Sequence, residues 1–385
     1  MADVINPPVS EITLDPERQE QAKEYAHISR RLMLLDLLLG AGYVLLWLYS
    51  GWSQALKSFL LTFTSHEWLL VAGFGLIFGG IFFIINLPLS VYEGYILPHR
   101  YGISNQTLKS WSSDQIKNIL LTILLGGFLL EVIYALLRTA PDTWWLWVGG
   151  ILLIFNVLLA NLAPLLLFPI FYKFVPLGNE NPDLTNRLMA LVNRAGTYVN
   201  GVFKFDMSRR TKAANAGLTG LGNTRRIILS DTLLEEFTTD EIETILAHEL
   251  GHHVHKDISK GILIQSVITL GGLYLASIGL NSGISFFGFS GPADVAALPL
   301  FVLMMGVYAL ITMPMLNAYS RSRERQADIY ALRITGNGPA FSSALTRLAN
   351  QNLADADPEP WVEFFLYSHP ALSKRIKLAE EYKSP

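Results

Sequence analysis

Three residues near the middle of the chain, His248, Glu249 and His252, form the pattern H-E-x-x-H. Residues four apart lie on one face of a helix, so the two imidazoles could bind a single metal ion. Glu249 would then lie beside that ion, where it could take a proton from a water that the metal activates. A buried helix with solvated or hydrogen-bonded histidines is the alternative. It is the weaker one, because half of the chain's 8 histidines fall in this segment.

The residues around this pattern predict the helix that it needs. Thr238 and Glu241 have the spacing of a capping box at a helix start. Apolar residues then recur at helical spacing, at Ile242, Ile245, Leu246 and Leu250. His253 lies on the same segment but a quarter-turn off the metal face. His255, seven residues after His248, could compete as a ligand, but the i,i+4 geometry favours His252. We therefore expect both of them to be solvated.

The composition points to a membrane protein without disulfides. Of the 385 residues, 51% are hydrophobic and only 16% are charged, whereas soluble domains carry about 25% charged residues. The net charge of −3 gives no indication of a nucleic-acid partner. The chain has no cysteine, which excludes disulfides, thiolate metal sites and cysteine nucleophiles. Any zinc must therefore be held by His, Asp or Glu.

Six stretches are long and apolar enough to cross a bilayer, which takes about 20 residues. They cover 32–49, 68–89, 119–137, 144–168, 262–280 and 296–316. The fourth ends in APLLLFPIF, where Pro164 or Pro169 could bend the helix or begin a seventh, re-entrant piece. Asp36 and Glu131 lie within spans, where a charge usually faces protein or water. They either line a hydrated cavity or pair with polar neighbours such as Asn86.

Lysine and arginine are concentrated in alternate loops, which places both termini and the large polar segment on the cytoplasmic side. The predicted organisation is a polar N-terminal segment (1–31), a four-span region (32–171), a soluble α+β insert with the H-E-x-x-H helix (172–260), a two-span hairpin (261–319) and a cytoplasmic helix with the C-terminal tail (320–385). Within the insert we expect a helix near 182–197 and strands at 201–206, 215–221 and 226–229, with a turn at Gly222-Asn223.

A catalytic zinc site has three protein ligands, so two histidines leave it one short. The run SRSRERQAD offers Glu324 as the third ligand. Asp328 lies four residues later on the same helical face, where it could accept a hydrogen bond from the other nitrogen of a liganding histidine. Such a run is more commonly a charged helix beside a membrane. The chain order favours the metal, because the two-span hairpin returns Glu324 to the membrane face from which the H-E-x-x-H helix departs.

Several motifs, taken in order, resemble the type I CAAX prenyl endopeptidases, integral-membrane zinc proteases related to the HtpX-type membrane proteases. They are VYEGYILPHRYGISNQT, NLAPLLLFPIFYKFVPL, RRIILSDTLLEE, ILAHELGHH, SRSRERQADIYAL and LYSHPALSKRI, from about Pro88 to the end of the chain. The resemblance implies that His248, His252 and Glu324 hold one zinc ion per chain. Glu249 would be the general base. The expected fold is an α-helical polytopic membrane protein with a small α+β zincin-like metalloprotease domain at its cytoplasmic face.

The resemblance also implies residues that touch the substrate. Asn215 and Ala216 match an Asn-Ala pair that holds the substrate backbone along an edge strand. His369 and Arg375 match tail residues that contact the substrate carbonyl or its oxyanion. Two departures concern specificity: GLTGLG replaces a stretch that commonly carries aromatics, and His253 replaces an aromatic. Six spans are also one fewer than the seven usual in eukaryotic members.

The expected function is that of a zinc metalloendopeptidase in a bacterial inner membrane or an ER-type membrane. Its partners would be the lipid bilayer and a peptide or protein substrate, prenylated or not. CAAX-like peptides are one substrate option, and misfolded membrane proteins cleaved in quality control are the other. A transporter or scaffold with structural zinc is less favoured. It leaves Glu249 unexplained, and structural zinc sites are usually closed by four protein ligands.

Overall fold

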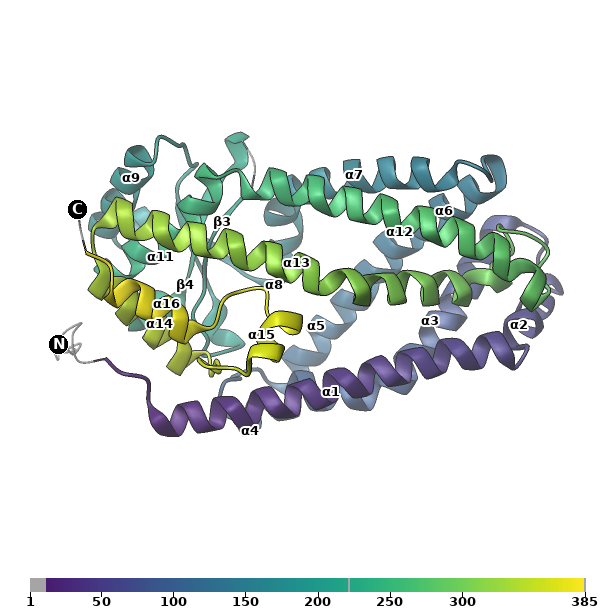
Figure 1. Ribbon diagram of the computed structural model, residues 1–385, viewed down its shortest axis with the longest axis horizontal. Coiled ribbons are helices and arrows are strands. Elements are labelled where there is room, and N and C mark those ends of the chain that lie inside the picture. Colours follow the sequence, from purple (N-terminus) through teal and green to yellow (C-terminus); the bar gives the residue numbers. More distant parts are fainter. Residues whose placement is uncertain (1–11, 221, 384–385) are drawn as a thin grey trace.

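The computed structural model describes residues 12–220 and 222–383, which form an elongated molecule with two parts (Figure 1). Long helices make up one end of the molecule. The strands and the helices around them make up the other end. Some residues of the predicted segments lie outside the described residues, namely 1–11, Leu221 and 384–385.

Within those residues, six helical runs are long and apolar enough to span a membrane, and they include all six predicted stretches. They are Pro16–Tyr49, Glu67–Arg100, Leu108–Thr139, Trp144–Phe171, Asp257–Phe287 and Val295–Thr335. The first is a single helix, α1 (Pro16–Tyr49), and the Asp15 side chain caps its start. The polar residues from 16 to 31 therefore continue the first span as one helix.

The next three spans are each interrupted by a π-helical turn. They consist of α3 (Glu67–Val91), η2 (Tyr92–Ile96) and α4 (Leu97–Arg100); α5 (Leu108–Leu121), η3 (Thr122–Gly126) and α6 (Gly127–Thr139); and α7 (Trp144–Leu162), η4 (Ala163–Leu167) and α8 (Phe168–Phe171). Pro164 lies in η4, where a missing N–H is accommodated by the wider turn. The APLLLFPIF stretch thus stays helical, and the alternative of a separate re-entrant piece is wrong for this described stretch. A short helix, α2 (Trp52–Leu61), follows the first span.

The two acidic residues predicted within spans have different surroundings. Asp36 accepts a hydrogen bond of 2.8 Å from the Asn86 amide, which is the polar pairing that the sequence left open. Glu131 has one buried carboxylate oxygen without a hydrogen-bond partner in the described part of the chain. Pairing therefore accounts for Asp36, and it does not fully account for Glu131.

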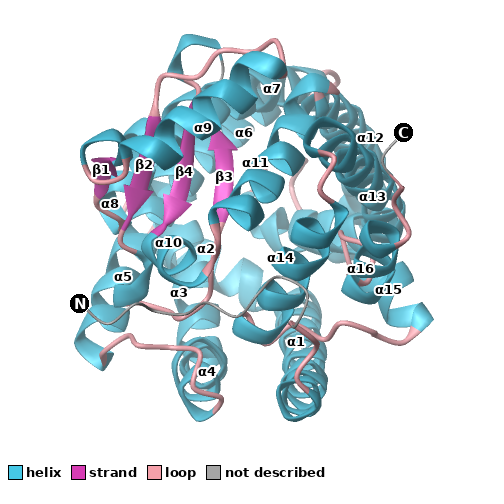
Figure 2. Cartoon of the chain, turned by 90° about the vertical axis from the view of Figure 1, so that its left-hand side faces the viewer, coloured by secondary structure: helices cyan, strands magenta, loops and turns pink. Residues whose placement is uncertain are grey.

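Four strands form one sheet in the order β1-β2-β4-β3 (Figure 2). They are β1 (Phe174–Pro176), β2 (Val202–Phe205), β3 (Ala216–Thr219) and β4 (Arg226–Ser230). β2 and β4 are parallel, and the other two pairs are antiparallel. The last three strands match predicted ones, whereas β1 is too short for an alternating pattern to reveal it. β3 is an edge strand, and it lies beside α11 (Thr239–Val254) (Figure 2).

Helices from both halves of the chain enclose this sheet in a single core. They include α9 (Pro182–Arg194), α10 (Asp231–Glu236), α14 (Gly338–Gln351) and α16 (Leu372–Glu380). α14 and α16 lie on the side of α11 away from the strands (Figure 2). Of the C-terminal tail, α14 packs on the H-E-x-x-H helix, α16 packs on α14, and α15 (Pro360–Leu366) packs on α13.

The H-E-x-x-H helix, α11, packs most extensively against α13 (Leu298–Thr335). α11 begins with the predicted capping box of Thr238 and Glu241. α13 carries the sixth span and continues to the α+β part without a break. At the contact, a Cβ on Gly251 would come within 2.9 Å of the Ala327 Cα, a distance that real Cβ atoms essentially never show. Gly251 thus permits an approach of the two helices that a larger residue would prevent.

We expect Gly251→Ala to destabilise the protein by about 1–3 kcal/mol, because the added methyl meets backbone that no side-chain rotation can move. The measurement is the thermal unfolding midpoint in detergent. Gly306→Ala is the matched control, since a Cβ at that position of α13 meets nothing within 4 Å. Equal midpoints for the two variants would contradict the proposed tight contact.

Candidate metal centre and active-site cleft

Three side chains from two helices come together where α11 meets α13. His248 and His252 come from α11 and Glu324 from α13, and one possible ligand atom of each lies within 4.8 Å of the others. The His248 Nε2 lies 3.2 Å from the Glu324 Oε2, and the His252 Nε2 lies 3.3 Å from the Glu324 Oε1. The two Nε2 atoms are 3.2 Å apart. Ligand atoms around tetrahedral zinc lie about 3.3 Å apart, given metal–ligand bonds of about 2.0–2.1 Å. The three residues therefore fit a zinc ion.

The far nitrogen of each histidine is held by a carboxylate. The His248 Nδ1 lies 2.8 Å from the Asp328 Oδ1, as the sequence predicted for Asp328. The His252 Nδ1 lies 3.0 Å from the Asp257 Oδ2. Such contacts fix the tautomer and leave Nε2 free for a metal.

Asp257 is a partner that the sequence analysis missed. It begins α12 (Asp257–Phe287) directly after Lys256, whose φ of 57° turns the chain between the two helices. In the sequence, the only indication of this contact is that Asp257 is an acidic residue five positions after His252. Its contact depends on that turn, because residues five apart on one continuous helix do not face each other.

The electrostatic environment of the cluster favours a cation. Burial alone would lower the pKa of His248, but its hydrogen bonds to Asp328 and Glu324 outweigh burial and raise that pKa to about 9. The same carboxylates would stabilise a metal ion in place of the proton.

Arg375 lies behind this cluster, with only 9% of its surface exposed. Its Nη2 donates to the Asp328 Oδ1 at 2.7 Å, and its Nε donates to the Asp328 Oδ2 at 2.9 Å. A bidentate contact of this kind fixes both partners. The guanidinium is thus engaged with Asp328, which in turn holds His248. Contact of Arg375 with substrate stays a prediction.

His369 has a more open position, in the loop between α15 and α16. Its Nε2 lies 3.3 Å from the Glu324 Oε1, while 59% of its side chain is exposed. The Ser368 hydroxyl lies 2.9 Å from its Nδ1. The structure therefore brings His369 from the C-terminal tail to the edge of the candidate metal centre, where a substrate could reach it.

A cavity of about 430 Å³ opens beside these groups. Glu249, His252 and Glu324 line it, together with Leu218 of β3. Leu316, the last residue of the sixth predicted span, lines it as well. The cavity therefore extends from the possible metal ligands to the edge strand and to the end of the sixth predicted apolar stretch. Ala216 is the first residue of that strand, two residues before Leu218, and Asn215 directly precedes it.

The two other histidines of the segment are less solvated than predicted. His253 lines the same cavity as Glu249. His255 packs against the Tyr330 ring with centroids 5.9 Å apart, and its Nδ1 is buried without a hydrogen-bond partner in the part of the chain that is described. Tyr330 belongs to α13, which the sequence does not place beside His255.

Two family models match most of the chain. The family model for peptidase family M48 matches residues 179–383, and a model described as CAAX prenyl protease N-terminal, five membrane helices, matches residues 3–173. The uncharacterized metalloprotease YhfN of Bacillus subtilis is 30% identical over 374 residues, covering 96% of this chain and 87% of that protein. CAAX prenyl protease 1 of Saccharomyces cerevisiae is 29% identical, covering 76% of this chain and 68% of its own length.

A solved structure extends the similarity to the whole fold. The crystal structure of S. mikatae Ste24p matches with a TM-score of 0.86 and 25% identity, over 99% of this chain and 93% of that one. The matched family model spans the H-E-x-x-H helix, Glu324 and the C-terminal tail. The chain therefore belongs to peptidase family M48, and it is a polytopic membrane metalloprotease of the CAAX prenyl protease type.

Proposed function

We propose that the metal of this protease is one zinc ion held by His248, His252 and Glu324. The spacing of the three ligand atoms supports zinc, and three protein ligands leave the open position that catalytic sites have. When bound, zinc would polarise the scissile carbonyl and lower the pKa of water to about 7. The alternative of a transporter or scaffold with structural zinc does not fit a chain that belongs to a peptidase family.

Glu249 is the general base in this proposal. Its carboxylate lines the open cavity beside His252 and Glu324, so it can accept a proton from the attacking water and return it to the leaving amine. This placement is the single observation that carries the proposed function. A structural metal site would have no need for a further carboxylate in an accessible cavity.

Two residues of the C-terminal tail assist in different ways. His369 lies at the edge of the metal centre and is exposed, which suits it to donate a hydrogen bond to the developing oxyanion. Arg375 acts through Asp328, whose carboxylate it holds in place behind His248. In this proposal His369 touches the substrate, and Arg375 positions a metal ligand.

The substrate peptide binds along the free edge of β3. Asn215 accepts a hydrogen bond of 2.9 Å from the Ser230 N–H, so its backbone faces β4. Alternation along a strand then turns the N–H and C=O groups of Ala216 and Leu218 to the opposite edge. An extended peptide could add there as a further strand, with its scissile bond next to the cavity that Leu218 lines.

The name of a relative and the course of the cavity both support the proposed substrate class. The yeast relative is named CAAX prenyl protease 1, which refers to a prenylated C-terminal CAAX peptide as substrate of that protein. In this chain the cavity reaches Leu316 at the end of a membrane helix, where a lipid-modified peptide could approach from the bilayer. We therefore favour a prenylated C-terminal peptide over a misfolded membrane protein. The positive residues of alternate loops favour a cytoplasmic site, with both termini on that side.

Glu249→Gln should keep its zinc and lose peptidase activity by at least about 100-fold, since it lacks the general base. Both enzymes would be purified in detergent, assayed for zinc, and offered a farnesylated CAAX peptide, the same peptide without lipid, and an unfolded membrane protein. Cleavage of the farnesylated peptide by the wild type alone is the expected result. Near-normal turnover by Glu249→Gln would refute the assignment of the base, and cleavage of only the unfolded protein would move the substrate to quality control.

Glu324→Ala should reduce the zinc content well below one per chain, because two histidines alone hold zinc weakly. The measurement is elemental analysis of protein purified without added metal. Glu381→Ala, which removes an exposed glutamate with a weak ion pair at 3.7 Å, is the matched control and should retain zinc. A full complement of zinc in Glu324→Ala would rule out Glu324 as a ligand.

His369→Ala should lower kcat by about 100-fold or more while zinc stays bound, because removal of one oxyanion donor has an effect of this order. Steady-state kinetics together with zinc analysis would test this. His66→Ala is the control, since His66 is exposed where α3 begins. A change confined to KM would show that His369 binds the substrate without stabilising the transition state.

A further inference from the structure

The short helix α15 has an exposed aromatic face. The side chains of Trp361, Phe364 and Phe365 are 59%, 51% and 45% exposed, whereas Val362 and Glu363 are buried. Positions 361, 364 and 365 are three and four apart, so the three rings lie on one face of the helix. A contiguous exposed apolar patch usually marks an interaction surface. The face therefore needs an apolar or interfacial partner.

α15 lies at the level where two membrane helices leave their apolar stretches. On one side, the Asn317 Nδ2 donates to the Phe365 carbonyl at 2.7 Å, and Asn317 directly follows the sixth predicted span. On the other side, the Arg30 Nη2 lies 3.6 Å from the Oε2 of Glu359, the N-cap residue of α15. Arg30 is two residues before the first predicted span. Both contacts thus place α15 where the hydrocarbon core meets the headgroup region.

α15 also lies on the outside of the molecule. Figure 2 shows it at the outer edge, on the side away from the sheet. On α13, Leu310 lies seven residues before Asn317 and so on the same helical face, and its side chain is exposed. The aromatic face therefore continues a surface that faces lipid along the sixth span.

The residues around this face suit the surface of a bilayer. Arg31, next to Arg30, is exposed. Lys374 forms an ion pair with Glu363, and most of its side chain is exposed. Aromatic rings with lysine and arginine beside them are typical of interfacial helices, whose rings enter the acyl boundary while the cations meet lipid phosphates.

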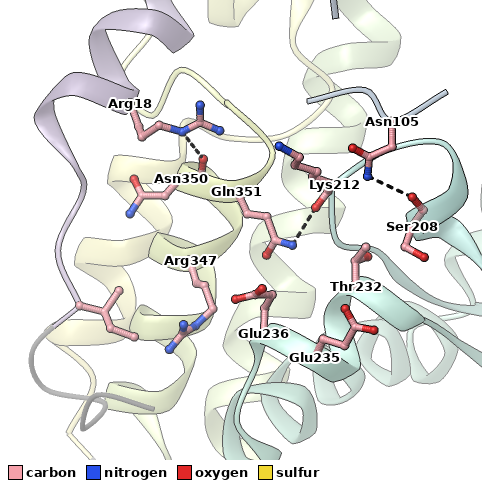
Figure 3. Close-up of a pocket in the computed structure, with 11 residues that line it drawn as sticks. Arg18, Asn105, Ser208, Lys212, Thr232, Glu235, Glu236, Arg347, Asn350 and Gln351 are labelled. Atoms are coloured by element: carbon pink, nitrogen blue, oxygen red, sulfur yellow. Dashed lines mark hydrogen bonds between the residues drawn. The ribbon is translucent and has the colours of Figure 1, made fainter. Parts of the chain in front are cut away.

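The segment that leads into α15 is attached to the first membrane helix. The Arg18 Nε donates to the Asn350 carbonyl at 3.3 Å, as Figure 3 shows. The Gln19 Nε2 donates to the Ala354 carbonyl at 3.2 Å, and the Gln19 Oε1 accepts from the Ala356 N–H at 3.1 Å. α15 is therefore held in place by α1 before it begins and by α13 where it ends.

The end of α15 leads to the candidate metal centre. The Arg321 Nη1 donates to three backbone carbonyls, those of Glu363 at 2.9 Å, Phe364 at 3.3 Å and Tyr367 at 2.7 Å. His369 follows two residues after Tyr367, at the edge of the metal centre. A displacement of α15 would therefore displace His369 as well.

We infer that α15 is an interfacial helix: Trp361, Phe364 and Phe365 enter the surface of the lipid bilayer, and this contact keeps the His369 loop in position. Lipid is the occupant because the aromatic face continues the surface of the spans at both of the helices that hold α15. The role for His369 rests on the proposed function, whereas the contact with lipid does not.

The contact with lipid can be tested with single spin labels, because the natural chain has no cysteine. Full-length Phe364→Cys would be labelled with a nitroxide and placed in nanodiscs of phosphatidylcholine and phosphatidylglycerol. Electron paramagnetic resonance would compare its collisions with oxygen, which concentrates in lipid, and with a water-soluble nickel complex. Ile311→Cys on the sixth span and Lys377→Cys on α16 are the matched controls, since both side chains are exposed.

We expect the oxygen-to-nickel collision ratio at position 364 to lie well above that at 377 and to approach that at 311. A ratio equal to that at 377 would overturn the inference. Protection from both reagents would also overturn it, because a protein partner would then cover the face. Phe365→Cys should give the same result as Phe364→Cys, and it covers the case in which the first variant does not fold.

The role for His369 is tested by kinetics in the same nanodiscs with a farnesylated CAAX peptide. Trp361→Ser combined with Phe365→Ser should lower kcat by about tenfold, part of the effect of losing an oxyanion donor, while zinc stays bound. The control combines Phe63→Ser with Phe286→Ser, two exposed aromatic residues remote from α15, and should keep its kcat.

A double-mutant cycle separates this role from general damage. In the His369→Ala background, the two serine substitutions on α15 should lower kcat little further. An equal further fall would show that α15 does not act through His369 and would overturn that part of the inference. A wild type that does not cleave the peptide would overturn the proposed function and the role for His369, while the spin labels would still decide the contact with lipid.

Discussion

The close contact of α11 with α13 is the constraint on which the site depends. Gly251 lets the two helices approach until their backbones nearly touch, at Ala327. Only at this separation can Glu324, on one helix, lie 3.2–3.3 Å from the imidazole nitrogens of the other. A metal site shared by two helices tolerates little error, because ligand bonds vary by only about 0.2 Å. The packing of the two helix backbones thus determines the distances between the three possible metal ligands.

That contact also buries charge, and the buried groups compensate one another. Asp328 is 1% exposed and Arg375 is 9% exposed, and each is the main partner of the other. Removing one member of such a pair leaves the other charge buried and unpaired, which costs several kcal/mol, typically about 3–5. The pair holds His248 from behind, while Glu249 and His369 stay accessible at the front. Rigid support and open reactive groups therefore lie on different sides of the same imidazole.

The sequence was sufficient for features that depend on local spacing. The six spans, the helix with His248 and His252, and the pairing of Asp328 with a histidine all follow from periodicity or from separations of four residues. Features that depend on distant contacts could not be predicted in this way. Asn352 contacts Ala214 across 138 residues, and such a contact leaves no pattern in either segment. Arg375 meets Asp328 only because the tail folds back over α11.

α13 also fixes the distance between its apolar stretch and the metal centre. Its apolar stretch ends at Leu316, and Glu324 follows eight residues later on the same unbroken helix. At 1.5 Å per residue this separation is roughly 12 Å. For the proposed lipid-anchored substrate, the scissile bond would have to lie about this far from the apolar stretch. The spacing along one helix would then set how far such a substrate is lifted before it is cut.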